Sequence, residues 1–155
     1  MIETSKYSDL NIATKSKLAN YIHGEFGHIS IVNETEWAKP DWTIILYLNN
    51  EIATFYNIVE RQILVDNKEV KVAGINNVIT PKKFRGNGYA SRILKETESL
   101  IFDDLKSEFG MLLCADSLIS FYERLNWKNI VDCPVYFEQP AGKKRVVIYV
   151  HVYHG

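Results

Sequence analysis

A glycine-rich, basic turn from Ile79 to Ala90 (ITPKKFRGNGYA) holds the residue types best suited to binding a charged ligand. Gly86 and Gly88 expose backbone N–H groups without obstruction by a Cβ atom. The amphipathic helix expected to follow leaves the N–H groups of its first turn unpaired and turns the positive end of its dipole outward. Such an arrangement binds anions, phosphate among them. The pattern therefore predicts an anion site, and the alternative interpretation is a plain strand-to-helix connection.

Length and composition indicate one domain spanning residues 1–155. Of the 155 residues, 46% are hydrophobic, which is enough to bury a core without disulfides or metals. The formal net charge of −1 argues against a nucleic-acid partner, because nucleic-acid binders rely on a concentrated basic surface.

The cysteines and the N-terminus indicate the compartment. Cys114 and Cys133 form no CxxC pair and have no histidine at metal-ligand spacing, so we expect reduced thiols and no metal site. Cys114 lies in an apolar run, where a buried structural thiol is expected rather than a nucleophile. No apolar run approaches the roughly 20 residues that span a bilayer, and the N-terminus lacks a signal-peptide pattern. These features predict a soluble cytoplasmic protein without a membrane partner.

The spacing of apolar residues predicts an α/β (α+β) fold. Helices are expected over residues 11–25, 93–105 and 118–125, and residues 29–40 are expected to form a loop. Strands are expected over residues 43–48, 51–64, 70–79 and 111–115, within 127–137, and over 145–153. This order predicts a mixed, mostly antiparallel central sheet with helices on both faces.

The element order and two motifs resemble the GNAT superfamily of acyl-CoA-dependent N-acetyltransferases. The family signature Arg/Gln-x-x-Gly-x-Gly/Ala is met by Arg85, Gly88 and Ala90. Further along, the run from Phe121 to Trp127 (FYERLNW) looks like the family's Phe-Tyr-x-x-x-Gly-Phe segment, with Asn-Trp in place of Gly-Phe. The resemblance covers roughly residues 42–130 and implies a GNAT-like fold with acetyl-CoA as co-substrate.

A closer likeness points to the aminoglycoside 2'-N-acetyltransferase branch. Residues 51–62 and 110–127, and the tail with Pro134, Gly142 and Arg145, look similar to that branch. The branch places a glutamate in its fourth strand, linked to deprotonation of the amine, and Asn76 stands at the matching position here. A neutral amide cannot act as a general base, so the base of that branch does not carry over. The acceptor stays open between an aminoglycoside, another polyamine-like metabolite, an amino acid and a protein amine.

The resemblance assigns a set of residues to acetyl-CoA. It implies that the diphosphate lies on the backbone N–H groups of the turn, near the Arg85 side chain, and that the end of the preceding strand pairs with the pantetheine arm and polarises the thioester carbonyl. The residues implied are Val78, Ile79, Thr80, Arg85, Gly86, Asn87, Gly88, Tyr89, Ala90 and Ser91.

The same motif implies that Tyr122 is the catalytic acid that protonates the departing thiolate of CoA. A phenol with a pKa of about 10 suits this role, because the thiol that it forms has a pKa near about 8.5. The alternative interpretation is a core aromatic, since Tyr122 shares a helix face with Leu118 and Leu125.

The base that deprotonates the amine is left open by the sequence. Titratable candidates are Glu60, His28, His151, His154 and the C-terminal carboxylate of Gly155. Each is more commonly an ordinary surface or strand residue. We expect Asn76 and Glu60 to contact the acceptor.

Taken together, these features predict an N-acetyltransferase that moves an acetyl group from acetyl-CoA directly to a primary amine of a small molecule, without a metal. Two alternatives are a non-catalytic acyl-CoA-binding regulatory module and an acyltransferase that uses a longer acyl-CoA. An exposed edge strand in the C-terminal pair could support a homodimer.

Overall fold

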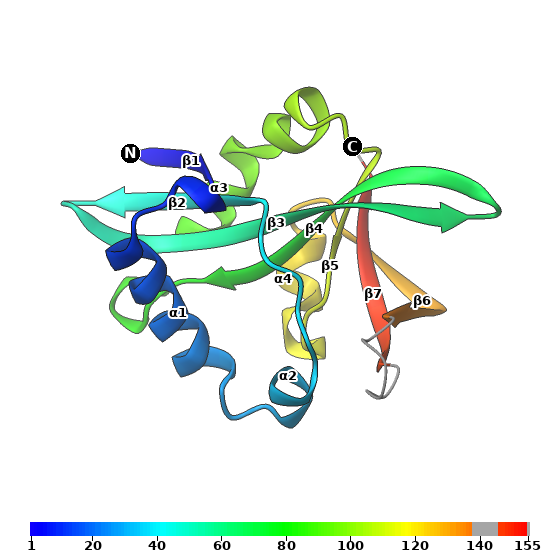
Figure 1. The fold of residues 1–155 in the computed structure, drawn as a ribbon, viewed down its shortest axis with the longest axis horizontal. Helices are drawn as coiled ribbons and strands as arrows, with labels where there is room; N and C mark the ends of the chain where they lie inside the picture. Colours follow the sequence, from blue (N-terminus) through cyan, green and yellow to red (C-terminus); the bar gives the residue numbers. More distant parts are fainter. Residues whose placement is uncertain (138–145, 155) are drawn as a thin grey trace.

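The computed structural model describes the backbone of residues 1–137 and 146–154 and the side chains of residues 1–130. Within these residues seven strands form one sheet in the order β1-β2-β3-β4-β5-β7-β6 (Figure 1). The strands are β1 (Ile2–Lys6), β2 (Trp42–Leu48), β3 (Glu51–Val65), β4 (Lys68–Ile79), β5 (Phe109–Leu112), β6 (Lys128–Phe137) and β7 (Val146–His154). The helices are α1 (Ile12–Phe26), α2 (Ser30–Glu34), α3 (Tyr89–Glu96) and α4 (Ile119–Glu123), and the shorter helical turns are η1 (Tyr7–Asp9), η2 (Lys82–Phe84), η3 (Leu100–Asp104) and η4 (Asp116–Leu118).

The sheet is antiparallel except at one pair of strands. Strands β1 to β4 pair in sequence as an antiparallel meander, and β7 pairs antiparallel with both β5 and β6. Strands β4 and β5 are parallel, and α3 and η3 provide the crossover that a parallel pair requires. The predicted mixed, mostly antiparallel sheet is therefore confirmed.

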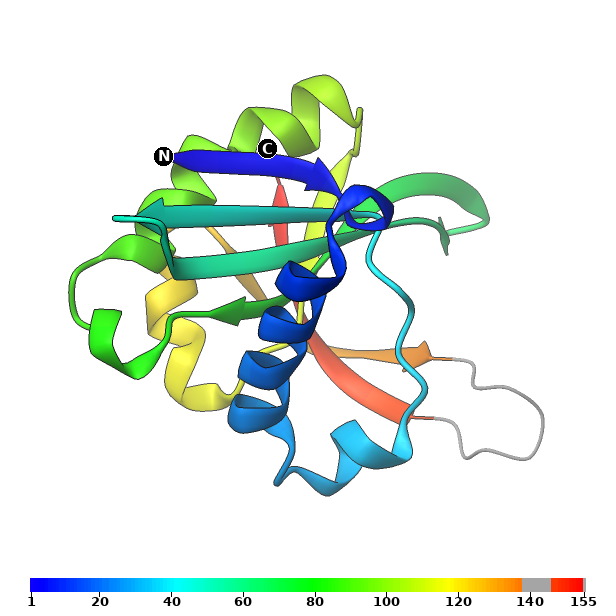
Figure 2. The same cartoon turned by 60° about the vertical axis from the view of Figure 1, so that its left-hand side comes forward.

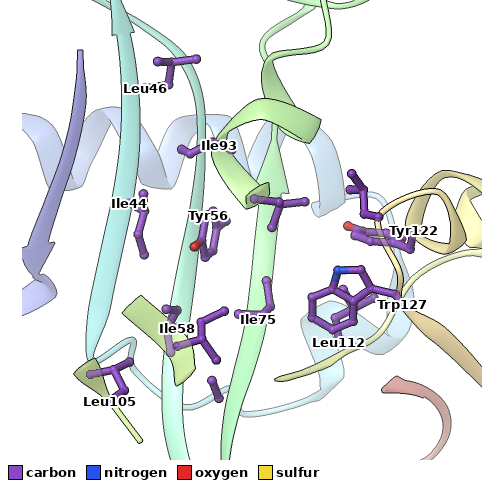
Figure 3. Packing of buried hydrophobic residues seen from close by; sticks show 14 of the residues in the cluster. Ile44, Leu46, Tyr56, Ile58, Ile75, Ile93, Leu105, Leu112, Tyr122 and Trp127 are labelled. Carbon is purple, nitrogen blue, oxygen red and sulfur yellow. The ribbon is translucent and has the colours of Figure 1, made fainter. Parts of the chain in front are cut away.

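Each face of the sheet is covered by helices, as predicted (Figure 2). The cluster beneath α3, η3 and α4 includes Ile44, Leu46, Tyr56, Ile58, Ile75, Ile93, Leu105, Leu112, Tyr122 and Trp127 (Figure 3). The cluster beneath α1 consists of Leu10, Leu18, Ile45, Ile52, Phe55 and Ile79. Because side chains alternate along a strand, neighbouring residues of β3 and β4 enter different clusters. We call these two sides the α3 face and the α1 face.

The N-terminal strand β1 and the short helix α2 were not predicted. The segment from Ile2 to Lys6 contains one large apolar residue, too few for an alternating pattern, and its extended form depends on pairing with β2. Helix α2 lies within the predicted loop and spans five residues.

The predicted helix over residues 93–105 is interrupted at Thr97. This residue leaves the helical region with φ −115°, and its Oγ1 bonds both the carbonyl of Ile93 and the hydroxyl of Tyr56, each at 2.6 Å. These bonds anchor the end of α3 to β3, and the chain continues as the π-helical turn η3.

The predicted strand over residues 111–115 was misplaced at both ends. Strand β5 begins at Phe109 and ends at Leu112, so Gly110, just outside the predicted strand, lies inside the observed one. The ring of Trp127 covers Gly110, because a Cβ atom built there would lie 3.0 Å from Trp127 Cη2. Only tertiary packing requires this glycine.

Within the part of the chain that the structure describes, no helix has both the length and the apolar character needed to cross a bilayer.

Candidate active site

The parallel strands β4 and β5 part in the middle of the sheet. Their register runs from Val72 opposite Phe109 to Ile75 opposite Leu112, where β5 ends. Strand β4 continues to Ile79, so residues 76–79 have no strand beside them on the β5 side within the described residues. Backbone N–H and C=O groups are obligatory hydrogen-bonding groups. The part of β4 beyond Ile75 can therefore pair with an extended ligand, and we call this place the opening.

A β-bulge lies at the start of the opening. Asn57 pairs with Asn76 whereas Phe55 pairs with Ile79, so β4 carries one more residue than β3 between these pairs. Asn77 has φ +53°, a left-handed conformation that asparagine tolerates better than most residues. The Asn77 side chain also donates from Nδ2 to Oδ1 of Asn76 at 3.1 Å. The bulge disturbs the ladder with β3 and thereby changes the direction of the backbone groups of β4.

The glycine turn connects β4 to α3. Gly86 has φ +79° and Gly88, the N-cap of α3, has φ +73°. An added Cβ would meet no atom within 4 Å at either position, so the backbone conformation and not crowding requires glycine. Asn87 Nδ2 closes the turn by donating to the carbonyls of Phe84 and Arg85, both at 3.1 Å.

The first turn of α3 suits a phosphate group. The N-cap side of α3 has no side-chain hydrogen bond, so the N–H groups of residues 89–91 are not capped within the described residues. Residues 85–88 are exposed and carry no acidic side chain. The geometry at these positions therefore fits a diphosphate bound by backbone N–H groups and the helix dipole.

The Arg85 side chain contacts other parts of the protein. Its Nε donates to the carbonyl of Thr80 at 2.9 Å, and its Nη2 lies 2.6 Å from Oε2 of Glu25, in the last turn of α1. Lys83 pairs with Glu51. Arg85 thus bonds Thr80, directly after β4, and Glu25 of α1, and the backbone N–H groups of the turn are left available to an anion.

The end of β4 brings the three predicted pantetheine residues to the opening. Val78 packs against the α3-face cluster and Ile79 belongs to the α1-face cluster. Thr54 Oγ1 donates to the carbonyl of Ile79, and Thr80 Oγ1 donates to Thr54 Oγ1, both at 3.0 Å. These bonds fix the end of the strand where the glycine turn begins.

Tyr122 lies on the α3 face beside the opening. Its side chain is 6% exposed and makes edge contacts with Phe121 and Trp127, at ring-centroid distances of 4.9 and 6.0 Å. Figure 3 shows its hydroxyl pointing away from α4 toward β4. Burial, and next the nearby thiol of Cys114, raise the pKa of Tyr122 above its usual value, so its hydroxyl stays protonated. Tyr122 is thus a core aromatic whose hydroxyl faces the opening, and its role as the acid stays a prediction.

Glu60 is engaged in an ion pair away from the opening. It accepts from Trp42 Nε1 at 2.9 Å and from Lys71 Nζ at 2.8 Å. Burial raises the pKa of Glu60, but the hydrogen bonds from Lys71 and Trp42 outweigh burial and leave it below its usual value. Glu60 pairs with Ala73, three residues before Asn76, or about 10 Å along the strand at 3.3 Å per residue. The structure therefore does not bring the two predicted acceptor residues together.

The other predicted bases are placed only in part. His28 is exposed between α1 and α2. In β7, the backbone of His151 pairs with Leu112 at the opening, whereas that of His154 pairs with Phe109 at the other end of β5. The side chains of these two histidines, and Gly155 as a whole, lie outside the described residues.

The structure also brings together residues that the sequence did not single out. Glu25 contacts Arg85, and Thr43 and Asn57 form a buried hydrogen bond beside Asn76. Strand register brings Thr43 and Asn57 beside Asn76, and the sequence pattern alone does not give this register. In the second motif, Asn126 has φ +66°, which accounts for the glycine that the family has at this place.

Comparison with solved structures supports the same architecture. ElaA from Escherichia coli superposes with a TM-score of 0.69 at 15% identity, covering 99% of this chain and 100% of that one. A putative N-acetyltransferase from Lactobacillus plantarum gives 0.68 at 17% identity, covering 99% and 97%. Eis1 from Mycobacterium abscessus gives 0.64 at 8% identity, covering 88% of this chain and 33% of that longer one. At these identities the likeness shows the fold.

The sequence comparisons give the family. No curated protein matches the chain. The profile of the acetyltransferase (GNAT) domain family matches residues 26–130, which include β2 to β5, the glycine turn and α4. Since this match covers more than half of the 155 residues, the chain belongs to the GNAT acetyltransferase domain family.

Proposed function

We propose that this protein is an acetyl-CoA-dependent N-acetyltransferase that acts on a primary amine of a small molecule by direct transfer. The observation that carries the proposal is the opening of β4 away from β5, with the glycine turn at its end and Tyr122 beside it. The proposal gives each of these features a role in one reaction.

Donor binding would rest on the backbone of β4 and of the glycine turn. The N–H groups of residues 86–91 would hold the diphosphate, and residues 78–80 would pair with the pantetheine arm. The bound group supplies the acetyl thioester. Backbone donors beside the thioester carbonyl would stabilise the negative charge that develops there, an effect worth about 3 kcal/mol for a well-placed donor.

Tyr122 would supply the proton that the leaving thiolate needs. A phenol is protonated at neutral pH, burial raises the pKa of Tyr122 further, and a neutral phenol can donate to a thiolate. A covalent enzyme intermediate on Cys114 is disfavoured. Burial, and next the carboxylate of Asp116, raise the pKa of Cys114 to about 11, and the protonated thiol is a poor nucleophile. This supports direct transfer.

Asn76 supports a second candidate, the non-catalytic acyl-CoA-binding module, because it stands where the aminoglycoside branch has an acidic residue. We favour the enzyme because Tyr122 faces the opening.

The same proposal includes an acetyl group as the acyl group, a cytoplasmic location and a reaction without a metal. It also includes a homodimer formed through β6, which lies at the edge of the sheet.

The test is a thiol-release assay with purified protein, acetyl-CoA and a panel of primary amines, run beside a thermal-shift titration with CoA. We expect CoA to raise the melting temperature and at least one amine to release thiol. Binding of CoA without thiol release for any amine would favour the non-catalytic module. Faster thiol release from acyl-CoAs with longer chains than from acetyl-CoA would show that the donor is a longer acyl-CoA.

A further inference from the structure

A row of uncharged polar side chains crosses three strands of the sheet. Thr43 of β2 pairs with Asn57 of β3, and Asn57 pairs with Asn76 of β4. Side chains of register partners in antiparallel strands lie on the same face, close enough to interact. Thr43 and Asn57 are 0% and 1% exposed, so the row begins in the interior and ends at Asn76, at the opening.

This row lies on the α1 face, opposite Tyr122. Ile58 and Ile75 belong to the α3-face cluster, so the alternation of side chains directs their neighbours Asn57 and Asn76 to the other side of the sheet. Helix α1 covers that side, as its contacts with Ile79 and Phe55 in the α1-face cluster show. The opening is therefore flanked by Tyr122 on one face and by Asn76 on the other.

Hydrogen bonds orient the carboxamides of the row. Thr43 Oγ1 donates to Oδ1 of Asn57 at 2.8 Å, and Asn77 Nδ2 donates to Oδ1 of Asn76 at 3.1 Å. The structure records no hydrogen bond from Nδ2 of Asn57 or of Asn76 within the residues that it describes. Asn76, at the opening, and its register partner Asn57 thus each keep a carboxamide NH₂ group on the α1 face.

A carboxamide NH₂ group donates hydrogen bonds, so both asparagines can donate to an oxygen atom of a ligand. The row contains hydroxyl and carboxamide groups and no carboxylate, so it offers hydrogen bonds to an oxygen atom and no counter-charge to a second ammonium group. Its chemistry matches an oxygen-bearing acceptor better than a polycation.

We propose that Asn57 and Asn76 form an acceptor subsite that selects amines with a hydroxyl or carbonyl oxygen near the reacting nitrogen, and that discriminates against polyamines. This inference rests on the proposed function. Thr43 and Asn77 are positioning residues, because they fix the orientation of the two carboxamides. The amine then approaches from the α1 face while Tyr122 lies on the α3 face.

The test uses four amines of similar size: ethylamine, ethanolamine, glycinamide and ethylenediamine. With saturating acetyl-CoA, we expect kcat/KM for ethanolamine and glycinamide to exceed that for ethylamine by about tenfold, the usual effect of one well-placed hydrogen bond to a buried group. Ethylenediamine should be no better than ethylamine. Asn76→Ala should remove the preference by raising KM for the two oxygen-bearing amines, with the KM for acetyl-CoA unchanged.

Two further variants separate positioning from folding. Thr43→Val keeps the shape of the side chain, removes the bond to Asn57 and should reduce the same preference. Thr35→Val is the matched control, because Thr35 is also a buried threonine but its hydroxyl has no hydrogen-bond partner. It should leave the preference unchanged.

A change of charge at Asn76 tests the selectivity against polyamines. Asn76→Asp should shift selectivity toward ethylenediamine, because the carboxylate supplies a counter-charge to the second ammonium group.

The outcomes distinguish this inference from the proposed function. Equal turnover of the four amines, or a preference that survives Asn76→Ala in a folded protein, would overturn the inference and leave the acetyltransferase standing. Absence of thiol release with every amine, while CoA still binds, would overturn both.

Discussion

The guanidinium of Arg85 bonds the carboxylate of Glu25 at 2.6 Å and so connects the glycine turn to the last turn of α1. The two side chains are 46% and 40% exposed, so the pair should contribute less than about 1 kcal/mol to stability. Its consequence is geometric. The cation of the family motif is held in this structure by helix α1, which covers the α1 face of the sheet.

Removal of that carboxylate should release Arg85. We expect Glu25→Gln to leave the melting temperature within a few degrees of the parent and to tighten CoA binding by about two- to fivefold, since a free guanidinium can reach an anion. Isothermal titration with CoA measures this, with Arg85→Gln as the opposing variant. If Glu25→Gln weakens binding as much as Arg85→Gln does, the pair positions the turn instead.

Gly88→Ala should weaken CoA binding without unfolding the protein. The φ of +73° costs a residue with a Cβ about 1–2 kcal/mol, and the turn is exposed with room for a methyl group. The matched control is Gly24→Ala in α1, where an added Cβ also meets nothing within 4 Å. That change should stabilise the helix by up to about 1 kcal/mol and leave CoA binding unchanged. Equal CoA affinity in both variants would contradict the backbone role assigned to the turn.

Two buried tyrosines should respond in opposite ways to replacement by phenylalanine. Tyr122→Phe should lower kcat by about a hundredfold or more while CoA affinity and stability hold, because no hydrogen bond to its hydroxyl is recorded within the described residues. Tyr56→Phe should cost about 1 kcal/mol of stability and keep kcat, because its hydroxyl bonds Thr97. Unchanged turnover in Tyr122→Phe would exclude it as the acid.

Burial of Tyr56 should make the stability of the fold decrease at alkaline pH. Burial raises the pKa of Tyr56 to about 12, whereas the unfolded chain ionises near 10, so the stabilisation is complete below about pH 10 and is lost as the pH rises toward 12. We expect the urea midpoint to fall over this interval and to fall less in Tyr56→Phe. An equal fall in both proteins would assign the effect to other groups.

Gly110→Ala should destabilise the pairing of β4 with β5, where Gly110 lies opposite Ala73. The added methyl would lie 3.0 Å from Trp127 Cη2, and overpacking of this kind costs about 1–3 kcal/mol. Because Trp127 packs against Tyr122, activity should fall as well. The double variant with Trp127→Phe, which removes the part of the ring that clashes, should recover stability in urea denaturation. Failure of this rescue would show that the backbone, and not the ring, requires glycine.

The strands and helices that the sequence predicted are those with strong local patterns. The Asn49–Asn50 turn adopts the left-handed φ values of +48° and +64° that a two-residue hairpin needs, as its sequence predicts. Strand β1 has no such pattern and exists because β2 offers an edge to pair with. The end of α3 at Thr97 depends on a bond to Tyr56, 41 residues away, which no local pattern contains.

The sequence by itself determined the conformation of the glycine turn, because its glycines and the helix that follows form a local unit of about ten residues that needs no distant partner. The tertiary structure decided what surrounds it. A one-residue bulge at Asn77 determines the face of the sheet on which each later side chain of β4 lies. Strand register places Asn57 beside Asn76. Lys71 forms an ion pair with Glu60 away from the opening. Each of these relations joins residues distant in the chain or depends on strand register, and only the folded sheet specifies it.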